Sequence, residues 1–220
     1  MKVIYGCLTN NSKIYEKYFI KSLKDKPRLS ITDISASIGI NKMLSVARRA
    51  EADIFVLAHQ DIMFPIGWEE RLRQLIITLP ADWSVIGLWG VTKEYTEVGN
   101  VADTRNCVLI DDYKVIVPFY GGQLPCQVET VDECCMILKL SSGITFDENM
   151  LGFHLYGTYA CRWAYEHGYT AWVINCCVLH ATDRPIDWRP LEDEIFNYNL
   201  EYLYKRFPNE KIISSVWWGE

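Results

Sequence analysis

The sequence lacks the short motifs that identify several large enzyme classes. It has no Gly-x-x-x-x-Gly-Lys-Ser/Thr loop, no Gly-x-Gly-x-x-Gly run after its first strand-like segment, and no Gly-x-Ser-x-Gly elbow. These patterns form the phosphate loop of many nucleotide hydrolases, the dinucleotide site of many oxidoreductases and the nucleophile turn of α/β-hydrolases. Their absence argues against all three chemistries.

The chain also lacks a leader-like N-terminus and any apolar run near the roughly 18 residues that a membrane-spanning helix needs. Residues 2–8 (KVIYGCL) already have the pattern of a strand. None of the eight cysteines belongs to a Cys-x-x-Cys pair, which argues against a zinc ribbon or a thioredoxin-like site. We therefore expect reduced cysteines in the core, no transmembrane segment and a cytoplasmic location.

Hydrophobic and acidic residues, in contrast, are plentiful. Half of the 220 residues are hydrophobic, with 13 tyrosines and eight tryptophans, which is enough for a sizeable core. The formal net charge of −6 disfavours nucleic acid and anionic membranes as partners, because the long-range field repels polyanions. Such a protein needs a divalent cation, a helix N-terminus or a few placed basic groups to bind a phosphorylated small molecule.

Strand-like and helix-like segments alternate over the first 90 residues. Strands are expected at 2–8, 28–35, 53–58 and 83–90, and helices at 11–24, 41–52 and 67–79. This alternation predicts an α/β fold with a mostly parallel, doubly wound central sheet flanked by helices. Ligands of such sheets bind at the carboxyl ends of the strands, where this sequence has polar residues: Thr9, Asn10, Asp33, His59, Gln60 and Asp61.

The pattern changes after residue 90, although the length still predicts a single domain of residues 1–220. A small antiparallel insertion is expected at 91–126, with a hairpin that turns at Asp111-Asp112 and a following Gly121-Gly122 loop. The remaining expected elements are a buried strand at 129–140, a helix that ends at Gly168, one or two strands within 170–182 and an amphipathic helix at 190–207.

Two apolar segments each end in a histidine, at His59 and at His180, and Asp61 follows the first of them. A charge at the end of a buried strand is paired, hydrated in a cleft or bound to a metal. A carboxylate oxygen suits Mg²⁺ or Mn²⁺, which take further ligands from substrate phosphates. The alternative is structural: Asp61 then caps the following turn, and both histidines are hydrogen-bonded structural residues.

The polar residues at the first strand ends also suggest a nucleotide pocket. Thr9, Asn10 and Asp33 follow the first two strands, and Asn41 and Lys42 open the second expected helix. Asp33 has the chemistry to accept a hydrogen bond from a base, and the asparagine amides have the chemistry to reach a base or a ribose. Alternatively, the asparagines are helix caps and turn formers.

Three residues are candidates for a general base in a group-transfer reaction, namely Asp132, Glu133 and His154. Each has a structural alternative. The acids stand near the start of an expected strand, where Asp132 can accept a local hydrogen bond, and His154 can pack at the N-terminus of the following helix.

Three segments in this order resemble the glycosyltransferase-like proteins related to family 2, which have the GT-A fold. They are 41–68 (NKMLSVARRAEADIFVLAHQDIMFPIGW), 131–140 (VDECCMILKL) and 146–180 (FDENMLGFHLYGTYACRWAYEHGYTAWVINCCVLH). The resemblance covers most of residues 1–182. Its most specific parts are the His-Gln-Asp segment and the Gly-Phe-His-x-Tyr-Gly segment followed by a late histidine. The resemblance implies a GT-A-like, or Rossmann-like, domain.

The resemblance also implies roles for single residues. In the family, an Asp-x-Asp motif holds Mn²⁺ or Mg²⁺ on the donor diphosphate, and it matches residues 59–61 here. Asp61 is thus the implied metal ligand, and His59 stands in the place of the first acid. The late metal-site histidine of some relatives matches His180. The base-contacting acid matches Asp33, and the asparagine that opens the next helix matches Asn41.

The sequence departs from the family pattern at the catalytic helix. Relatives carry one or two acids near residues 156–159, whereas this chain has Tyr-Gly-Thr-Tyr. Tyrosine is a weak base at neutral pH, since its unperturbed pKa is about 10. The resemblance therefore implies donor binding more firmly than turnover, unless Asp132, Glu133 or His154 replaces the missing acid.

We therefore expect a Mn²⁺- or Mg²⁺-dependent glycosyltransferase that uses a nucleotide-diphosphate sugar. The resemblance favours a UDP-sugar, because related enzymes commonly use this donor. The expected acceptor is a glycan or another small molecule of unknown identity. Residues 1–90 would form the nucleotide-binding half, 91–182 the acceptor side with the late histidine, and 183–220 a C-terminal helical tail. Three aromatic residues are candidates for stacking on sugar rings, namely Trp89, Tyr120 and Trp188.

Two alternatives stay open at this point. One is a nucleotide-sugar-binding protein of the same fold with weak or lost catalysis. The other is a sugar nucleotidyltransferase, which is disfavoured because no glycine-rich loop with Arg or Lys follows the first strand.

Overall fold

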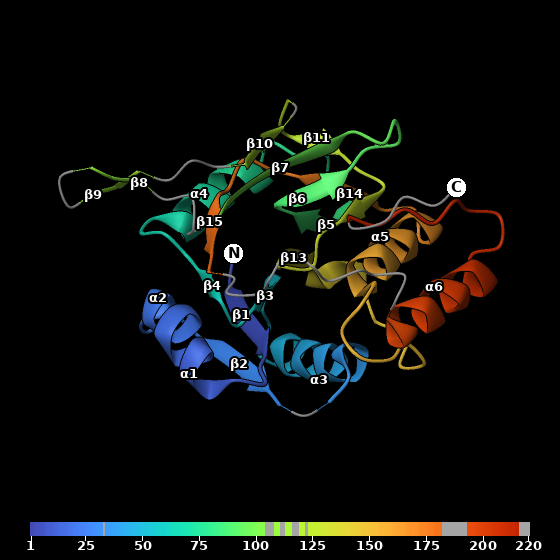
Figure 1. The fold of residues 1–220 in the computed structure, drawn as a ribbon, viewed down its shortest axis with the longest axis horizontal. Coiled ribbons are helices and arrows are strands. Elements are labelled where there is room, and N and C mark those ends of the chain that lie inside the picture. Colours follow the sequence, from blue (N-terminus) through green and yellow to red (C-terminus); the bar gives the residue numbers. More distant parts are fainter. Residues whose placement is uncertain are drawn as a thin grey trace.

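The computed structural model describes residues 1–32, 34–103, 108–110, 113–115, 119–121, 123–181 and 193–215, with only the backbone for residues 100, 102, 103, 108–110, 113–115 and 119–121. Its largest sheet has seven strands in the order β11-β14-β5-β13-β3-β1-β2 (Figure 1). Their bounds are Cys126–Gln127, Thr170–Val173, Trp83–Gly87, Cys135–Lys139, Ile54–His59, Val3–Leu8 and Arg28–Ile31.

Most strands of this sheet run in the same direction. The pairs β1–β2, β1–β3 and β14–β5 are parallel. The strand β13 is antiparallel to both of its neighbours, β3 and β5, and β11 is antiparallel to β14. The start of β13 therefore lies at the same edge of the sheet as the ends of β1 and β3. The prediction of a mostly parallel central sheet is confirmed.

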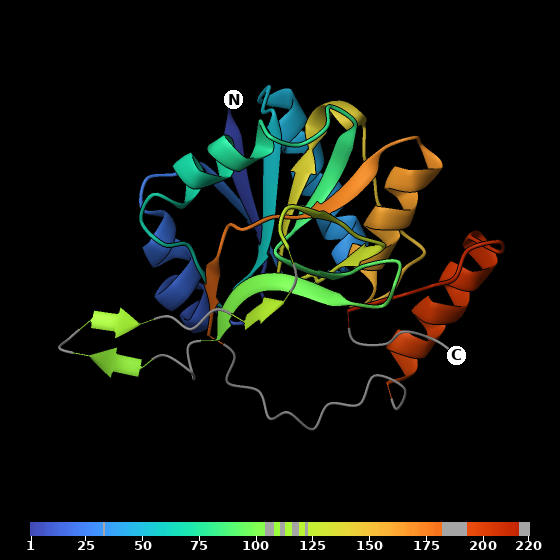
Figure 2. The ribbon, with the colours of Figure 1, turned by 90° about the horizontal axis from the view of Figure 1, so that it is seen from above.

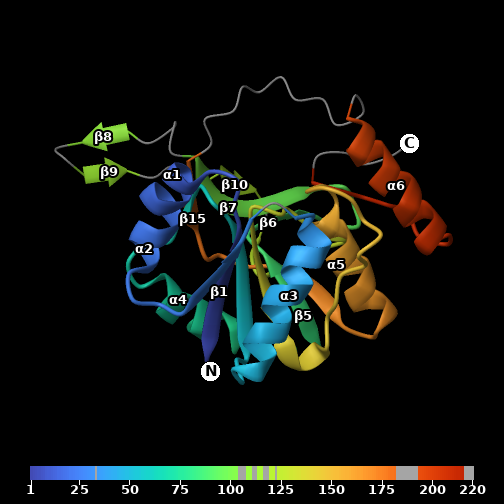
Figure 3. The same cartoon turned by 90° about the horizontal axis from the view of Figure 1, so that it is seen from below.

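Helices cover both faces of the sheet, which explains the nearly continuous apolar runs in its strands. On one face lie α3 (Ala36–Arg49), α5 (Tyr156–Glu166) and α6 (Glu194–Arg206), with α6 outside α5 in Figure 3. On the other face lie α4 (Trp68–Ile76) and the helical stretch of α1 (Ser12–Tyr15), the π-helical turn Glu16–Ile20 and α2 (Lys21–Leu23).

A second sheet has the strand order β12-β6-β7-β15-β4, and β10 (Phe119–Gly121) pairs with β7. Its strands are Thr130–Val131, Trp89–Val91, Glu97–Asp103, Val178–His180 and Ile62–Met63. A separate antiparallel pair, β8 (Val108–Ile110) with β9 (Tyr113–Val115), projects from the body of the molecule in Figure 2. This pair confirms the expected hairpin, whose turn at 111–112 lies outside the described residues.

Several predicted boundaries are wrong, each for a local reason. The expected strand at 83–90 splits into β5 and β6, which belong to different sheets. The glycines at the bend permit close packing, because a Cβ built on Gly87 would lie 2.5 Å from Val131 and one on Gly90 2.4 Å from the Thr130 carbonyl oxygen. The second helix begins at Ala36, so Asn41 lies inside it and does not open it.

The C-terminal helix begins at Glu194, after Asp193, whose side chain accepts hydrogen bonds from the N–H groups of Ile195 and Phe196. The expected start at Pro190 lies outside the described residues. The seven cysteines that the structure describes are all free thiols; five are buried, whereas Cys126 and Cys177 are partly exposed and do not lie in the core. Among the described residues, no helix has the length and apolar character needed to cross a bilayer.

Candidate active site

The candidate site lies at the edge of the large sheet where β1 and β3 end. Because β13 runs in the opposite direction, its lead-in residues Asp132, Glu133 and Cys134 reach the same edge, and the His59 N–H donates to the Cys134 carbonyl oxygen at 2.9 Å. The second sheet closes one side, since His180 of β15 pairs with Ile62 of β4. A cavity of about 480 Å³ lies between these elements.

The cavity brings together nine of the twelve residues that the sequence singled out for catalysis, nucleotide binding or metal binding. They are Thr9, Asn10, His59, Gln60, Asp61, Asp132, Glu133, His154 and His180. These residues come from five separate parts of the chain, so their convergence is a property of the fold. It does not by itself assign any of their roles.

His59, Asp61 and His180 form the cluster best suited to a metal ion. One potential ligand atom from each residue lies within 4.8 Å of the others. The His180 Nε2 atom is 3.4 Å from Asp61 Oδ1, and the two imidazole rings are 6.0 Å apart between centroids. Ligand bonds of about 2.1 Å allow ligand atoms to be at most about 4.2 Å apart, so small side-chain shifts would complete the set.

The protonation of Asp61 also suits a cation site. Burial raises the pKa of Asp61, but the hydrogen bond and charge of His180, together with the charge of His59, outweigh burial and hold the pKa below its ordinary value. A metal ligand must be deprotonated, and this carboxyl group is ionised at neutral pH. Two imidazoles and one carboxylate form a donor set that fits a divalent transition-metal ion.

Besides the backbone hydrogen bond to Cys134, a side-chain contact fixes the position of His59. Its Nε2 atom is 3.1 Å from the hydroxyl of Tyr156, which also donates to the Glu133 carbonyl oxygen at 3.4 Å. Burial and the charge of Glu133 hold the pKa of Tyr156 well above its ordinary value. The Tyr156 hydroxyl therefore keeps its proton and serves as a support for His59, not as a base.

Gln60 organises the loop that follows β1. Its Oε1 atom accepts hydrogen bonds from the Thr9 hydroxyl at 2.8 Å and from the N–H groups of Asn10 and Asn11 at 3.1 and 3.0 Å. Its Nε2 group donates to Asn10 Oδ1 at 2.7 Å. The side chain of Gln60 is thus committed to the cavity wall, and Asn11 caps α1 by accepting from the Ile14 N–H.

The two acids before β13 have different surroundings. Asp132 accepts a hydrogen bond at each oxygen, from the Cys134 N–H at Oδ1 and from the Ser215 hydroxyl at Oδ2, both at 2.8 Å. Glu133 accepts from the Gly157 N–H at 3.0 Å, at the start of α5. Burial raises the pKa of Glu133 to about 8, although the Gly157 hydrogen bond opposes the shift.

Gly157 makes room for the Glu133 side chain. A Cβ built on Gly157 would lie 2.6 Å from the Val131 carbonyl oxygen and 3.0 Å from Glu133 Cγ. A carboxylate from the β13 lead-in thus reaches the helix start where this chain has no acid of its own. The first N–H groups of a helix have no partner within the helix, and Glu133 accepts from one of them.

His154 lies at the other side of the cavity, 3.2 Å through Nε2 from Asp193 Oδ2. The same aspartate caps α6 through its other oxygen. The ring of His154 also packs edge-on against Phe196, with 6.1 Å between centroids. The histidine therefore joins the loop before α5 to the start of α6.

The structure does not bring all candidates into the cavity. The Asn41 side chain donates to the Phe146 carbonyl oxygen at 2.8 Å and accepts from the Phe146 N–H at 2.9 Å, which ties α3 to the loop before α5. Neither Asn41 nor the exposed Lys42 lines the cavity. Asp33 lies outside the described residues, as do Trp188 and the side chain of Tyr120, and Trp89 does not line the cavity.

Sequence reasoning missed several residues that line the cavity. The polar ones are Thr158, Ser214 and Ser215, and the aromatic ones are Phe153 and Phe196. The serines follow two buried isoleucines near the C-terminus, Ile212 and Ile213. That apolar pair is the one local sign that the segment after α6 returns to the body of the protein.

Comparisons with known proteins agree with this architecture. No family model matches the chain. The solved mannosyltransferase PcManGT from Pyrobaculum calidifontis, in complex with GDP-Man and Mn²⁺, superposes with a TM-score of 0.59 and 10% identity, over 96% of this chain and 65% of its own. The fold is GT-A-like. The fold implied by the family resemblance is thereby confirmed, and at this identity the likeness shows the fold alone.

Two further proteins resemble this chain, but neither adds evidence on its fold or activity. A protein of Fuscovulum blasticum described as "ATP synthase subunits region ORF 6" is 34% identical over 179 residues, which is 76% of this chain and 66% of that protein. This chain thus spans just under two thirds of that relative. The inositol-1-phosphate CTP transferase from T. maritima superposes with a TM-score of only 0.38 and 14% identity, over 90% of this chain and 76% of its own.

Proposed function

We propose that this chain is a cation-dependent glycosyltransferase of the family 2-related kind, which transfers a sugar from a nucleotide-diphosphate sugar. The observation that carries the proposal is the meeting of His59, Asp61 and His180 with the acid pair Asp132 and Glu133 in one cavity. The GT-A-like fold is shared with a mannosyltransferase that was solved with GDP-Man and Mn²⁺. UDP-sugars and GDP-sugars are therefore the first donors to test.

Asp61 and His180 would hold the cation, and His59 would complete the set. A bound Mn²⁺ or Mg²⁺ supplies charge neutralisation of the diphosphate leaving group. The cavity edge formed by Thr9 and Asn10 is fixed by Gln60, which suits a rigid wall for the nucleotide.

Asp132 is the residue that we assign as general base. Its carboxylate lines the cavity and accepts a hydrogen bond at each oxygen, and an ionised carboxylate with about four acceptor sites retains capacity for a substrate hydroxyl. In this role Asp132 takes the proton from the acceptor hydroxyl as that oxygen attacks the sugar. Glu133 is less suited, because its carboxylate caps α5 and its raised pKa leaves it largely protonated at neutral pH.

The competing function is a nucleotide-sugar-binding protein that does not transfer. It is favoured by the Tyr-Gly-Thr-Tyr sequence at the start of α5, where relatives carry acids. The two functions differ in turnover and not in donor binding, so one experiment has to measure both.

The experiment combines calorimetry with UDP and GDP, with and without Mn²⁺, and a donor-hydrolysis and transfer assay on the same preparations. The proposal expects cation-dependent binding of one nucleotide diphosphate and turnover of the matching sugar donor. Asp132→Asn should keep nucleotide affinity within about twofold and lower kcat by about 100-fold or more, in the range of general-base catalysis. Binding without turnover for every donor supports the binding protein, and absence of nucleotide binding contradicts both.

A further inference from the structure

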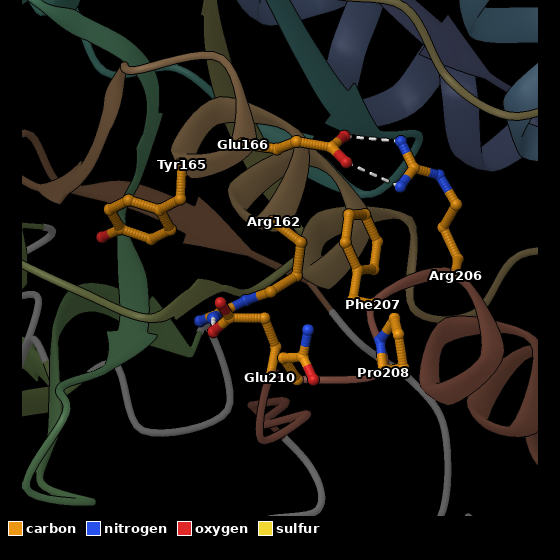
Figure 4. Close-up of a pocket in the computed structure, with 8 residues that line it drawn as sticks. Arg162, Tyr165, Glu166, Arg206, Phe207, Pro208 and Glu210 are labelled. Atoms are coloured by element: carbon orange, nitrogen blue, oxygen red, sulfur yellow. Dashed lines mark hydrogen bonds and ion pairs between the residues drawn. The ribbon is translucent and has the colours of Figure 1, made fainter.

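The segment from Phe207 to Ser215, which we call the C-terminal strap, returns from the end of α6 to the candidate site. Just before the strap, Arg206 at the end of α6 donates to both carboxylate oxygens of Glu166 on α5, at 2.7 and 2.5 Å (Figure 4). Further along, the buried Arg162 of α5 donates to Glu210 of the strap at 3.0 Å. Two guanidinium–carboxylate contacts thus join α6 and the strap to α5.

A cavity of about 250 Å³ lies beside these contacts, lined by α5, the end of α6 and the strap. The terminal nitrogens of both arginines are already paired, since Arg162 also donates to the carboxylate and the carbonyl oxygen of Glu129, whereas its buried Nε has no hydrogen-bond partner among the described residues. The charged groups around this cavity therefore serve to attach the strap and do not indicate a second ligand site.

The end of the strap is buried against the body of the protein. Ile212 and Ile213 are fully or almost fully buried, and the Thr158 hydroxyl donates to the Ile213 carbonyl oxygen at 3.3 Å. Thr158 stands one turn before Arg162 on α5, so the two contacts follow the same side of the helix. The strap delivers Ser214 and Ser215 into the wall of the large cavity.

Ser215 then donates its hydroxyl hydrogen to Asp132 Oδ2 at 2.8 Å. The other oxygen of Asp132 accepts from the Cys134 N–H. With both contacts the carboxylate has one orientation, whereas the Cys134 contact alone leaves rotation about the Cβ–Cγ bond. A catalytic base needs such an orientation, because small misplacements cost much of the rate.

We propose that Ser215 is a positioning residue, which the C-terminal strap carries to Asp132 so that this carboxylate faces the acceptor. The inference rests on the proposed function, since it gives Asp132 its task. Ser215 does not touch the reacting atoms in this proposal. Its effect reaches the reaction through Asp132 alone.

The first test compares Ser215→Ala and Ser215→Thr with wild type in the transfer assay. Ser215→Ala should lower kcat about tenfold, the effect of losing one orienting hydrogen bond. The KM for the donor and the nucleotide affinity should stay within about twofold. Ser215→Thr, which keeps the hydroxyl, should restore most of kcat. A matched control is Ser142→Ala, whose hydroxyl bonds to Ser84 and the Lys139 carbonyl oxygen, away from the cavity.

A second readout does not require activity. Ser215→Ala should speed hydrogen exchange of the Cys134 amide several-fold in NMR, because the Asp132 oxygen that accepts from it is no longer held. Unchanged exchange at Cys134, or an unchanged kcat in an active enzyme, overturns the inference. If wild type shows no turnover, the proposed function fails, and the Cys134 amide still decides whether Ser215 orients Asp132.

Discussion

His180 Nε2 lies 3.4 Å from Asp61 Oδ1, although the two residues are far apart in the sequence. Two pairings of the second sheet produce this proximity. His180 pairs with Ile62, and the Ala181 N–H donates to the Asp61 carbonyl oxygen at 2.9 Å. The backbone therefore holds the two side chains next to each other whether or not a cation is bound.

Asp61→Asn should weaken Mn²⁺-dependent nucleotide binding by about tenfold or more, because it removes the one anionic ligand of the cluster. The fold should persist, since the pair with His180 is partly exposed and contributes about 1 kcal/mol or less to stability. Calorimetry with UDP or GDP and Mn²⁺ measures the first effect, and urea unfolding the second.

The matched control for Asp61→Asn is Asp82→Asn, at an exposed position just before β5, at the opposite edge of the sheet. It makes the same change in charge away from the cavity and should leave binding unaltered. Wild-type affinity in the Asp61 variant would show that the cation is held elsewhere or is not used.

The composition of the cluster predicts a preference among cations. Imidazole nitrogen is a better ligand for Mn²⁺, Co²⁺ and Zn²⁺ than for Mg²⁺, which prefers oxygen donors. In the absence of nucleotide, direct titration should therefore give tighter binding of Mn²⁺ than of Mg²⁺ by about tenfold or more, and His180→Ala should reduce the difference. Equal affinity for the two cations in wild type would argue that the histidines are not ligands.

Glu133 should make stability depend on pH. Its pKa is raised from an ordinary value of 4.5 to about 8 by burial first, with the charge of Asp132 in the same direction and the N–H groups of residues 155–157 opposed. A raised folded-state pKa contributes stability that is fully present below about pH 4.5 and is lost as pH rises to about 8.

Glu133→Gln removes this dependence, because glutamine does not titrate. Relative to wild type, the variant should gain a few kcal/mol in the free energy of unfolding between pH 5 and pH 8.5. Urea unfolding of both proteins across this range measures the difference. A difference that is constant with pH would mean that Glu133 ionises normally in the folded state.

Gly157→Ala should destabilise the protein by about 1–3 kcal/mol, because the new methyl group meets the Val131 carbonyl oxygen at 2.6 Å. Helix propensity alone predicts the opposite sign, a gain of about 1 kcal/mol for alanine over glycine. Chemical unfolding therefore separates the two effects by sign. Stabilisation would show that α5 has more room at its start than the structure indicates.

Asn41→Ala distinguishes a structural role from the nucleotide contact that the family resemblance implies. The change removes both hydrogen bonds to Phe146, so we expect a loss of about 1–3 kcal/mol in the free energy of unfolding. Nucleotide affinity, measured below the unfolding range, should stay within twofold. A larger loss of affinity in a folded variant would show that Asn41 contacts the nucleotide.

Much of this fold was predictable because periodicity and strand ends are local signals. The alternation of strands and helices through α4 (Trp68–Ile76) follows from buried faces such as Ile40, Met43, Leu44 and Ala47 on α3. The position of His59-Gln60-Asp61 at a strand exit likewise predicted their place at the edge of the sheet where the large cavity lies.

The errors came from long-range relationships. A bend at Gly87 to Gly90 that moves the chain between sheets has no periodic signature, because it depends on the close approach of Thr130 and Val131. The contribution of Ser215 depends on the return of the strap to the cavity. The apolar pair Ile212-Ile213 is a local sign of burial, but it does not indicate where the strap packs. The helix start at Ala36 was missed because residues 28–35 were assigned to one strand, which hid the N-cap Ser35, and because Asn41 has the composition of a cap.

The reversed direction of β13 also has a consequence for how this site can change over evolution. The proposed cation ligands of β3 and the acids of the β13 lead-in meet at one edge but belong to segments that enter it from opposite ends. Under the proposed function, the residue that acts on the acceptor and the residues that hold the cation lie in different segments, so one segment can be substituted while the sequence of the other is kept.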